Sequence, residues 1–154
     1  MKDAQGLFEK CVNLEPKDKL HREDLLMIKT LIRSSEELDK VFNEKDFKKA
    51  ESLSESILQK CTEYSKIKQI YVESLIQNSK FSEVVEFVEN KVGDDDDADM
   101  FNYYVALSKY KEGKYEESKK ILHYLSENST SDQKYTKLMN IINVIEQDKE
   151  KGNN

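Results

Sequence analysis

The chain contains little proline, glycine or cysteine. One proline and four glycines in 154 residues leave few positions for the tight turns that β-hairpins require. The two cysteines, Cys11 and Cys61, are 50 residues apart, which excludes a disulfide framework or a cysteine-rich zinc site as the default expectation. We therefore expect packed, unreactive thiols in a reducing compartment.

Long apolar runs and an excess of positive charge are also missing. No run approaches the roughly 18 apolar residues of a membrane span, and Met1-Lys2-Asp3 leads into a charged segment rather than a signal sequence. The 25 basic residues are interleaved with 31 acidic ones, for a net charge of −6, whereas nucleic-acid binding needs a basic patch. We expect no membrane and no nucleic-acid partner, and a location in the cytoplasm, with the nucleus as an alternative.

Helix-forming residues dominate the rest of the chain, and they follow a regular step. The segments EKDFKKA, NSKFSEV and EGKYEES share one pattern, in which Phe47, Phe81 and Tyr115 are each 34 residues from the next. Apolar residues at spacings of three and four flank each aromatic, for example over 67–76 and 84–92. This pattern predicts three helix–turn–helix units. An equal step is expected because a single helical hairpin cannot bury its apolar faces alone.

A 34-residue helical hairpin with an aromatic just after its turn resembles the tetratricopeptide repeat (TPR). That family places small residues where the two helices of a hairpin meet. In the frame set by the aromatics, these positions hold Leu38, Ala50, Val72, Val84, Ala106 and Ser118. Ala50 and Ala106 match well, while the closing proline of the family is missing from all three units. The resemblance implies an all-α fold, a right-handed α-solenoid of antiparallel helical hairpins.

The same frame predicts the organisation of the whole chain. It predicts the second helix of a truncated repeat at 1–18, a long helix leading into a repeat unit at 19–64, repeat units at 65–98 and 99–130, and a long C-terminal helix that runs into a further repeat at 131–154. This layout resembles the J-domain (DnaJ) co-chaperones that carry blocks of tetratricopeptide repeats.

The resemblance implies protein or peptide binding on a concave surface lined by the first helix of each hairpin. The partners would be chaperones of the heat shock protein 70 and 90 classes, or their client chains. The residues expected to contact them are Asp39, Ile70, Met100 and Tyr104. An adaptor unrelated to chaperones, such as the mitochondrial-fission type, is the alternative, and a self-associating scaffold is a third reading.

The family's carboxylate clamp, in which cationic and amide side chains hold an acidic C-terminal tail, is not expected to be complete. In the full repeats the clamp positions hold Ser35, Asp39, Ile70, Met100 and Tyr104, none of them cationic. Lys149 and Asn153 match the first two clamp positions, but of a repeat whose remainder is not present. They form an incomplete clamp at most.

The sequence shows no constellation of residues typical of catalysis. His21 and His123 are isolated, and no glycine-rich loop that could hold a phosphate is present. The run Asp94–Asp97 lacks the spacing of a calcium loop, and is expected to be a linker that caps a helix. We expect a non-catalytic protein without metal or cofactor.

Overall fold

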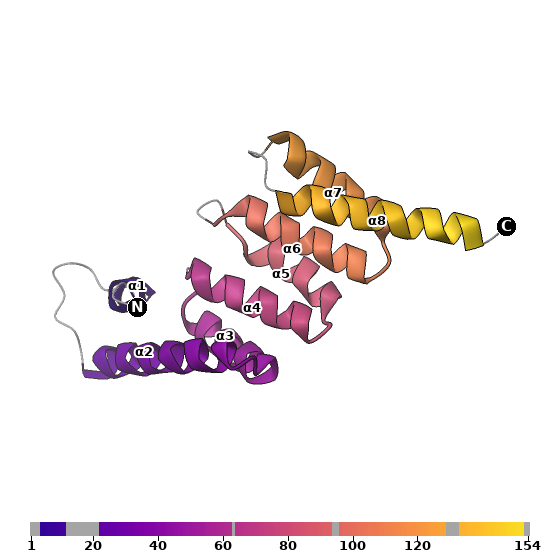
Figure 1. Cartoon of the computed structure of the whole chain (residues 1–154). Helices are drawn as coiled ribbons and strands as arrows, with labels where there is room; N and C mark the ends of the chain where they lie inside the picture. The colour runs from indigo at the N-terminus through magenta and orange to yellow at the C-terminus, as the bar shows by residue number, and fades with distance from the viewer. Residues whose placement is uncertain (1–3, 12–21, 63, 94–95, 129–132, 153–154) are drawn as a thin grey trace. The chain divides into compact units, whose positions relative to one another are not determined.

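The computed structural model describes residues 4–11, 22–62, 64–93, 96–128 and 133–152. Within these ranges the chain forms eight α-helices and no β-strand (Figure 1), so the predicted all-α class is confirmed. The helices are α1 (Ala4–Cys11), α2 (Arg22–Asn43), α3 (Phe47–Lys60), α4 (Ser65–Gln77), α5 (Phe81–Lys91), α6 (Ala98–Lys111), α7 (Tyr115–Asn128) and α8 (Gln133–Gly152). None of them is both long and apolar enough to cross a membrane.

Two aspartates begin helices by capping them. The carboxylate of Asp46 accepts a hydrogen bond from the backbone N–H of Lys49 at 3.3 Å, and that of Asp97 accepts one from Met100 at 3.1 Å. Such bonds satisfy N–H groups that have no partner inside the first turn of a helix. Asp97 is the last residue of the acidic run, so the predicted capping role is confirmed for it.

The turns that precede α3, α5 and α7 share a left-handed residue. Lys45, Ser79 and Gly113 have φ angles of 62°, 61° and 80°, and each lies two residues before the aromatic that begins the next helix. At the end of α6, the N–H of Gly113 donates to the Tyr110 carbonyl at 3.0 Å, and the N–H of Lys114 donates to that of Lys109 at 2.8 Å. This is the Schellman pattern that ends many helices.

The end of α2 repeats this pattern. The N–H of Lys45 donates to the Phe42 carbonyl at 3.0 Å, and the N–H of Asp46 donates to the Val41 carbonyl at 2.9 Å. The turn geometry is therefore the same after α2 and α6, although glycine occupies the left-handed position only in the second case.

The chain divides into two compact units, and the first is Met1–Asn78. In it α1 packs on α2, α2 on α3, and α3 on α4. Phe8 of α1 is fully buried and meets Tyr64 edge to face, with ring centroids 5.7 Å apart. The Asn78 side-chain amide donates to the Phe47 carbonyl at 3.1 Å and to the Glu51 carboxylate at 2.9 Å, which joins the end of α4 to α3.

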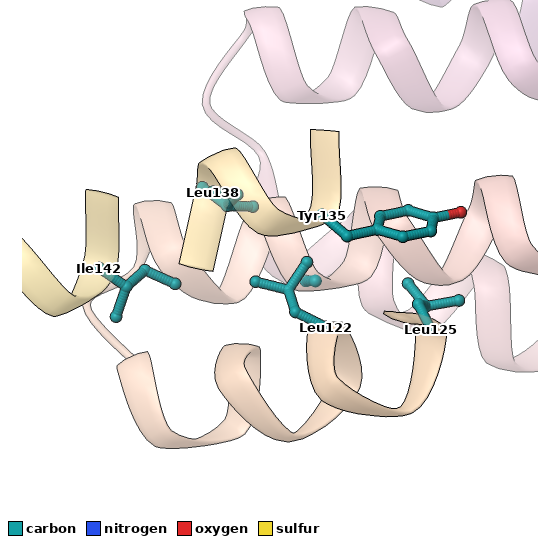
Figure 2. Close-up of a cluster of buried hydrophobic side chains, with 6 residues drawn as sticks. Leu122, Leu125, Tyr135, Leu138 and Ile142 are labelled. Carbon is teal, nitrogen blue, oxygen red and sulfur yellow. The ribbon is translucent and has the colours of Figure 1, made fainter. Parts of the chain in front are cut away.

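The second unit is Ser79–Asn154, in which α5 packs on α6, α6 on α7, and α7 on α8. Figure 2 shows side chains of α8 directed toward Leu122 and Leu125 of α7. The buried cluster consists of Ala106, Leu122, Leu125, Tyr135, Leu138 and Ile142. Elsewhere on α8, Ile141 and Val144 remain about half exposed. The helix therefore buries one apolar stripe and leaves a second, shorter one in solvent.

The boundary between the two compact units falls between α4 and α5, within the range 65–98 of one predicted repeat unit. The reason is that α4 packs on α3, whereas α5 packs on α6, so the two helices of that predicted hairpin belong to different units. The predicted division into repeat units stays a prediction. The predicted long helices within 19–64 and 131–154 correspond to α2, with 22 residues, and α8, with 20.

Cys61 does not have the free thiol that the sequence led us to expect. It lies at the C-terminal cap of α3, is buried, and is disulfide-bonded. The sequence contains one other cysteine, Cys11, at the end of α1, whose side chain lies outside the described residues. The distance between two cysteines in the sequence was a poor guide, because packing of successive helices brings distant segments together.

Candidate partner-binding surface

Two of the predicted contact residues, Met100 and Tyr104, lie on α6 of the second unit. Both side chains are half-buried. The first turn that carries Met100 is fixed by the Asp97 cap, and Tyr104 lies one helical turn further along. The Tyr104 ring meets Phe101 at 6.2 Å and Tyr103 at 6.3 Å between centroids. Tyr104 therefore belongs to an aromatic surface of α6.

This aromatic surface continues onto α8. The Tyr103 ring lies 5.7 Å from that of Tyr135, with the two planes tilted by 49°. Lys134 places its ammonium 4.8 Å from the Tyr103 centroid and 5.6 Å from the Tyr135 centroid, which is the range of cation–π attraction. We call these residues, namely Phe101, Tyr103, Tyr104, Lys134 and Tyr135, the tyrosine cluster.

Such a cluster is suited chemically to binding rather than to catalysis. Tyrosine offers a flat apolar ring, a polar hydroxyl and few rotatable bonds, so it contacts a partner at a low cost in conformational entropy. Phe101 and Tyr135 are buried and hold the cluster in place, while Tyr103 and Tyr104 keep part of their surface in solvent. The sequence pointed to Tyr104 but missed Lys134 and Tyr135, because their contact with α6 depends on tertiary packing.

The other two predicted contact residues, Asp39 and Ile70, lie in the first unit. Asp39 is half-buried, and its carboxylate is 3.9 Å from the Lys66 ammonium. Ile70 is only 5% exposed, so it presents almost no surface to a partner in this structure. A contact of Ile70 with a partner stays a prediction.

The burial of Ile70 follows from the character of α4. This helix buries residues on several sides: Ile67, Lys68, Ile70, Val72, Ser74 and Leu75. A helix that is apolar around most of its circumference lies inside a protein rather than on its surface. The frame taken from the repeats assumed that one face of α4 was open.

The residues at the clamp positions have no cation among them, and two of them, Ser35 and Ile70, are buried. Ser35 is buried, and its hydroxyl donates to the Ile32 carbonyl at 2.8 Å. Lys149, predicted for the incomplete clamp, places its ammonium 5.0 Å from the centre of the Tyr115 ring. Asn153 lies outside the described residues. The incomplete clamp stays a prediction.

The residues predicted to define the repeat differ in burial. Ala50 and Ala106 are fully buried, as expected where two helices approach closely. Phe47, Phe81 and Tyr115 are only half-buried. Two of these aromatics contact the helix before their turn: Phe47 meets Phe42 at 5.9 Å, and Tyr115 meets Tyr110 at 6.1 Å. These two aromatics therefore brace the turn between the two helices.

Ion pairs join neighbouring helices of the second unit. The Lys119 ammonium donates to the Glu146 carboxylate at 2.7 Å, linking α7 to α8, and this bond is the main reason why its pKa is raised. Lys109 of α6 lies 2.9 Å from Glu117 of α7, and its hydrogen bond lowers the pKa of that carboxyl. Both pairs are partly exposed, so they orient the helices more than they stabilise them.

Other candidate chemistry is limited in the part of the chain that the structure describes. His123 is exposed and pairs with Glu127 on the same helix at 3.0 Å; His21 lies outside the described residues. No group of three or more His, Cys, Asp or Glu side chains is placed there to hold a metal ion. The comparisons add no further constraint: no protein-family model, no curated protein and no solved structure matches this chain.

Proposed function

We propose that this chain is a non-catalytic protein–protein interaction module built from tetratricopeptide-type hairpins, arranged as a right-handed α-solenoid. The observation that carries the proposal is the recurrence of a left-handed turn residue at positions 45, 79 and 113. A structural repeat should reproduce its turn geometry as well as its hydrophobic pattern. Three left-handed residues at the 34-residue step of the aromatics support the repeat independently of the apolar spacing from which it was inferred.

The burial of the small-residue positions also supports the proposal. All six positions at which the two helices of a hairpin would meet are fully buried: Leu38, Ala50, Val72, Val84, Ala106 and Ser118. Each of the six belongs to a pair separated by twelve residues, one on the helix before a turn and one on the helix after it. Burial at these positions is what a series of helical hairpins requires, and for two of the three pairs the helices that carry them, α2 with α3 and α6 with α7, pack on each other.

For the partner, we propose extended client segments of a J-domain co-chaperone system rather than acidic chaperone tails. Tyr104 and Met100 offer apolar and aromatic surface on one helix, and the cation of the tyrosine cluster, Lys134, lies over the rings of Tyr103 and Tyr135. An acidic tail needs cations to hold its carboxylates, while an unfolded segment exposes apolar side chains that the tyrosine cluster can contact. The tyrosine cluster is therefore the proposed binding surface.

Cytoplasmic or nuclear localisation belongs to the same proposal and rests on the resemblance. A lasting disulfide is rare in those compartments. The redox state of Cys61 in cells is therefore a direct test of the localisation.

The experiment compares two labelled ligands by fluorescence anisotropy. One is a reduced and carboxymethylated model protein, which stays unfolded; the other is a short peptide with an acidic C-terminal tail. We expect the full chain to bind the unfolded protein and not the acidic peptide. Tyr104→Ala should weaken binding by about tenfold, the size of effect of a buried aromatic contact at an interface.

Tyr124→Ala is the matched control, because Tyr124 lies on α7, is 59% exposed and is not part of the tyrosine cluster. It should bind as the parent does. Tight binding of the acidic peptide would contradict the proposed partner class and direct the search to cations elsewhere on the chain. Failure of both ligands would favour the adaptor unrelated to chaperones.

A further inference from the structure

The first unit carries a hollow lined almost entirely by charged side chains. Its volume is about 410 Å³, and it lies between the C-terminal half of α2 and the start of α3. The lining residues are Arg33, Glu36, Glu37 and Lys40 of α2, Glu44 directly after it and Lys49 of α3, with Val41 between them. Val41 is buried and forms a small apolar floor. None of these residues belongs to the proposed peptide-binding surface.

Most of these charges are not used within the described chain. Glu37 pairs with Lys49 at 3.2 Å. The side chains of Arg33, Glu36, Lys40 and Glu44 take part in no ion pair or hydrogen bond with the described residues. Four-residue spacings such as that of Lys40 and Glu44 would permit pairs along the helix, but these pairs do not form. The hollow therefore offers both signs of charge to a partner.

Four of these charges alternate in sign along the helix, so that the same series running in the opposite direction would place an opposite charge at every position. Arg33, Glu37 and Lys40 of α2 are followed at the same kind of spacing by Glu44, directly after the helix, with steps of four, three and four residues. The N–H of Glu44 donates to the Lys40 carbonyl at 3.0 Å, which continues the helical geometry, so the four charges follow one face. This charged stripe extends over about 16 Å, at 1.5 Å per residue. Read toward the C-terminus its signs are plus, minus, plus, minus. Read in the opposite direction they are minus, plus, minus, plus.

An antiparallel second copy of α2 would therefore match every charge. Arg33 would face Glu44 of the second copy, and Glu37 would face Lys40 of the second copy, with both pairs formed twice. The alternation of three- and four-residue steps is the spacing at which two helices pack side by side. A contact in which the same patch serves on both subunits is the isologous contact of a two-fold dimer.

We propose that two copies of this chain associate through the charged stripe of α2, antiparallel, about a two-fold axis between Glu37 and Lys40. Charge complementarity selects a second copy over an arbitrary helix, because a partner of one sign would leave half of the stripe facing like charges. The interface is small and polar, so the dimer should be weak and sensitive to salt. This inference does not depend on the peptide-binding proposal.

The test uses two variants whose stripes carry a single sign. Arg33→Glu with Lys40→Glu makes the stripe wholly acidic, and Glu37→Lys with Glu44→Lys makes it wholly basic. Sedimentation velocity is measured for the full chain up to several hundred micromolar, at low salt and at about 0.5 M salt, where screening acts over a few ångströms. We expect a salt-sensitive dimer for the parent. The dimer dissociation constant should rise at least about tenfold for each variant alone, and an equimolar mixture of the two should associate again.

Lys91→Glu with Lys137→Glu is the matched control, since it changes the net charge by the same amount on exposed positions of α5 and α8. It should dimerise as the parent does, and circular dichroism should show that all variants are folded. A parent that is monomeric at low salt overturns the proposal, and so do single-sign variants that dimerise like the parent. A mixture that stays monomeric also overturns it, because only the self-complementary stripe predicts recovery.

Discussion

The Ser118 hydroxyl of α7 donates a hydrogen bond to the Ala106 carbonyl of α6 at 2.7 Å, and both residues are fully buried. These are two of the positions at which the repeat frame predicts close contact between the helices of a hairpin. An alanine and a serine allow the backbones to approach, and the serine satisfies its own hydroxyl by bonding across the contact. Two consequences for substitutions at Ser118 follow.

Ser118→Ala should lower the free energy of unfolding by about 0.5 to 1.5 kcal/mol, the typical net value of one hydrogen bond. Ser118→Leu should cost more, about 1 to 3 kcal/mol or above, because the larger side chain overpacks the contact. Urea denaturation measures both. Ser126→Ala is the control on the same helix, since Ser126 is exposed and should change little. Equal stability of the Ala and Leu variants would contradict a close contact at this point.

Two neighbouring isoleucines of α8 should respond differently to truncation. Ile142 is fully buried against α7, whereas Ile141 is 48% exposed. Ile142→Ala should lower the free energy of unfolding by about 2 to 5 kcal/mol, through lost burial and the cavity left behind. Ile141→Ala should cost well under half of that. Thermal or urea denaturation of the two variants tests whether α8 turns its Ile142 face toward α7. A larger loss of stability for Ile141→Ala than for Ile142→Ala would contradict this orientation.

The left-handed turn residues predict opposite effects of glycine and alanine. Gly113→Ala should destabilise the chain by about 1 to 2 kcal/mol, because a left-handed conformation is costly for any residue with a Cβ atom. Lys45→Gly and Ser79→Gly should each stabilise it by up to about 1 kcal/mol, since they remove that cost. Ser56→Gly inside α3 provides the control, and should instead lose roughly 0.5 kcal/mol. A loss for all four variants in urea denaturation would exclude the shared turn geometry.

The ion pairs of α7 should contribute a constant amount to the free energy of unfolding over the middle of the pH range. Part of this contribution should be lost at high pH and part at low pH. The pKa of Lys119 is raised above its ordinary 10.5, first by its hydrogen bond to Glu146 and then by that to Glu116. Its contribution is therefore complete below pH 10.5 and is lost as the pH rises through the folded-state pKa. The pKa of Glu117 is lowered from 4.5, first by the hydrogen bond of Lys109. Its contribution is complete above pH 4.5 and is lost as the pH falls through the folded-state pKa.

These signs are checked by urea denaturation of Lys119→Met and Glu117→Gln across the pH range. The difference in stability between parent and Lys119→Met should shrink at high pH, and that between parent and Glu117→Gln should shrink at low pH. A difference in stability that stays constant across the whole pH range would show that the pKa values of Lys119 and Glu117 are the same in the folded and the unfolded chain.

Because Cys61 is disulfide-bonded, its sulfur should not react with alkylating reagents even when unfolding removes its burial. In protein purified without reductant and then unfolded in guanidinium, Cys61 should not react with iodoacetamide, and it should react fully after reduction. Reduction should also lower the free energy of unfolding by about 2 to 4 kcal/mol, as is typical of disulfides. Labelling of Cys61 in the unreduced, unfolded protein, detected by peptide mass spectrometry, would contradict the bond.

Local features of the fold could be read from the sequence, and features that depend on packing could not. The step of Phe47, Phe81 and Tyr115 gives the first residues of α3, α5 and α7, because aromatic turns and apolar spacing are local signals. The left-handed backbone at Lys45 and Ser79 carries no such signal, since neither is a glycine. It becomes visible only through its equivalence to Gly113.

The contacts within the candidate site depend on tertiary packing and had no local signal in the sequence. Tyr104 was chosen from its place in the repeat frame, but its neighbour Tyr103 reaches Tyr135 on a helix whose position depends on the whole second unit. Ile70 was assigned to an open face because one side of α4 was assumed to be free. A helix that is apolar on several sides gives no sequence signal of which side faces solvent.

The packing of each helix on its sequence neighbours has a consequence for how quickly the protein folds. Within each described unit, the main helix contacts join elements that follow one another directly along the chain. Forming them requires only short loops to close, and the entropy lost in closing a short loop is small. The chain should therefore refold on the fast time scale of helical proteins with mainly local contacts, in milliseconds or less.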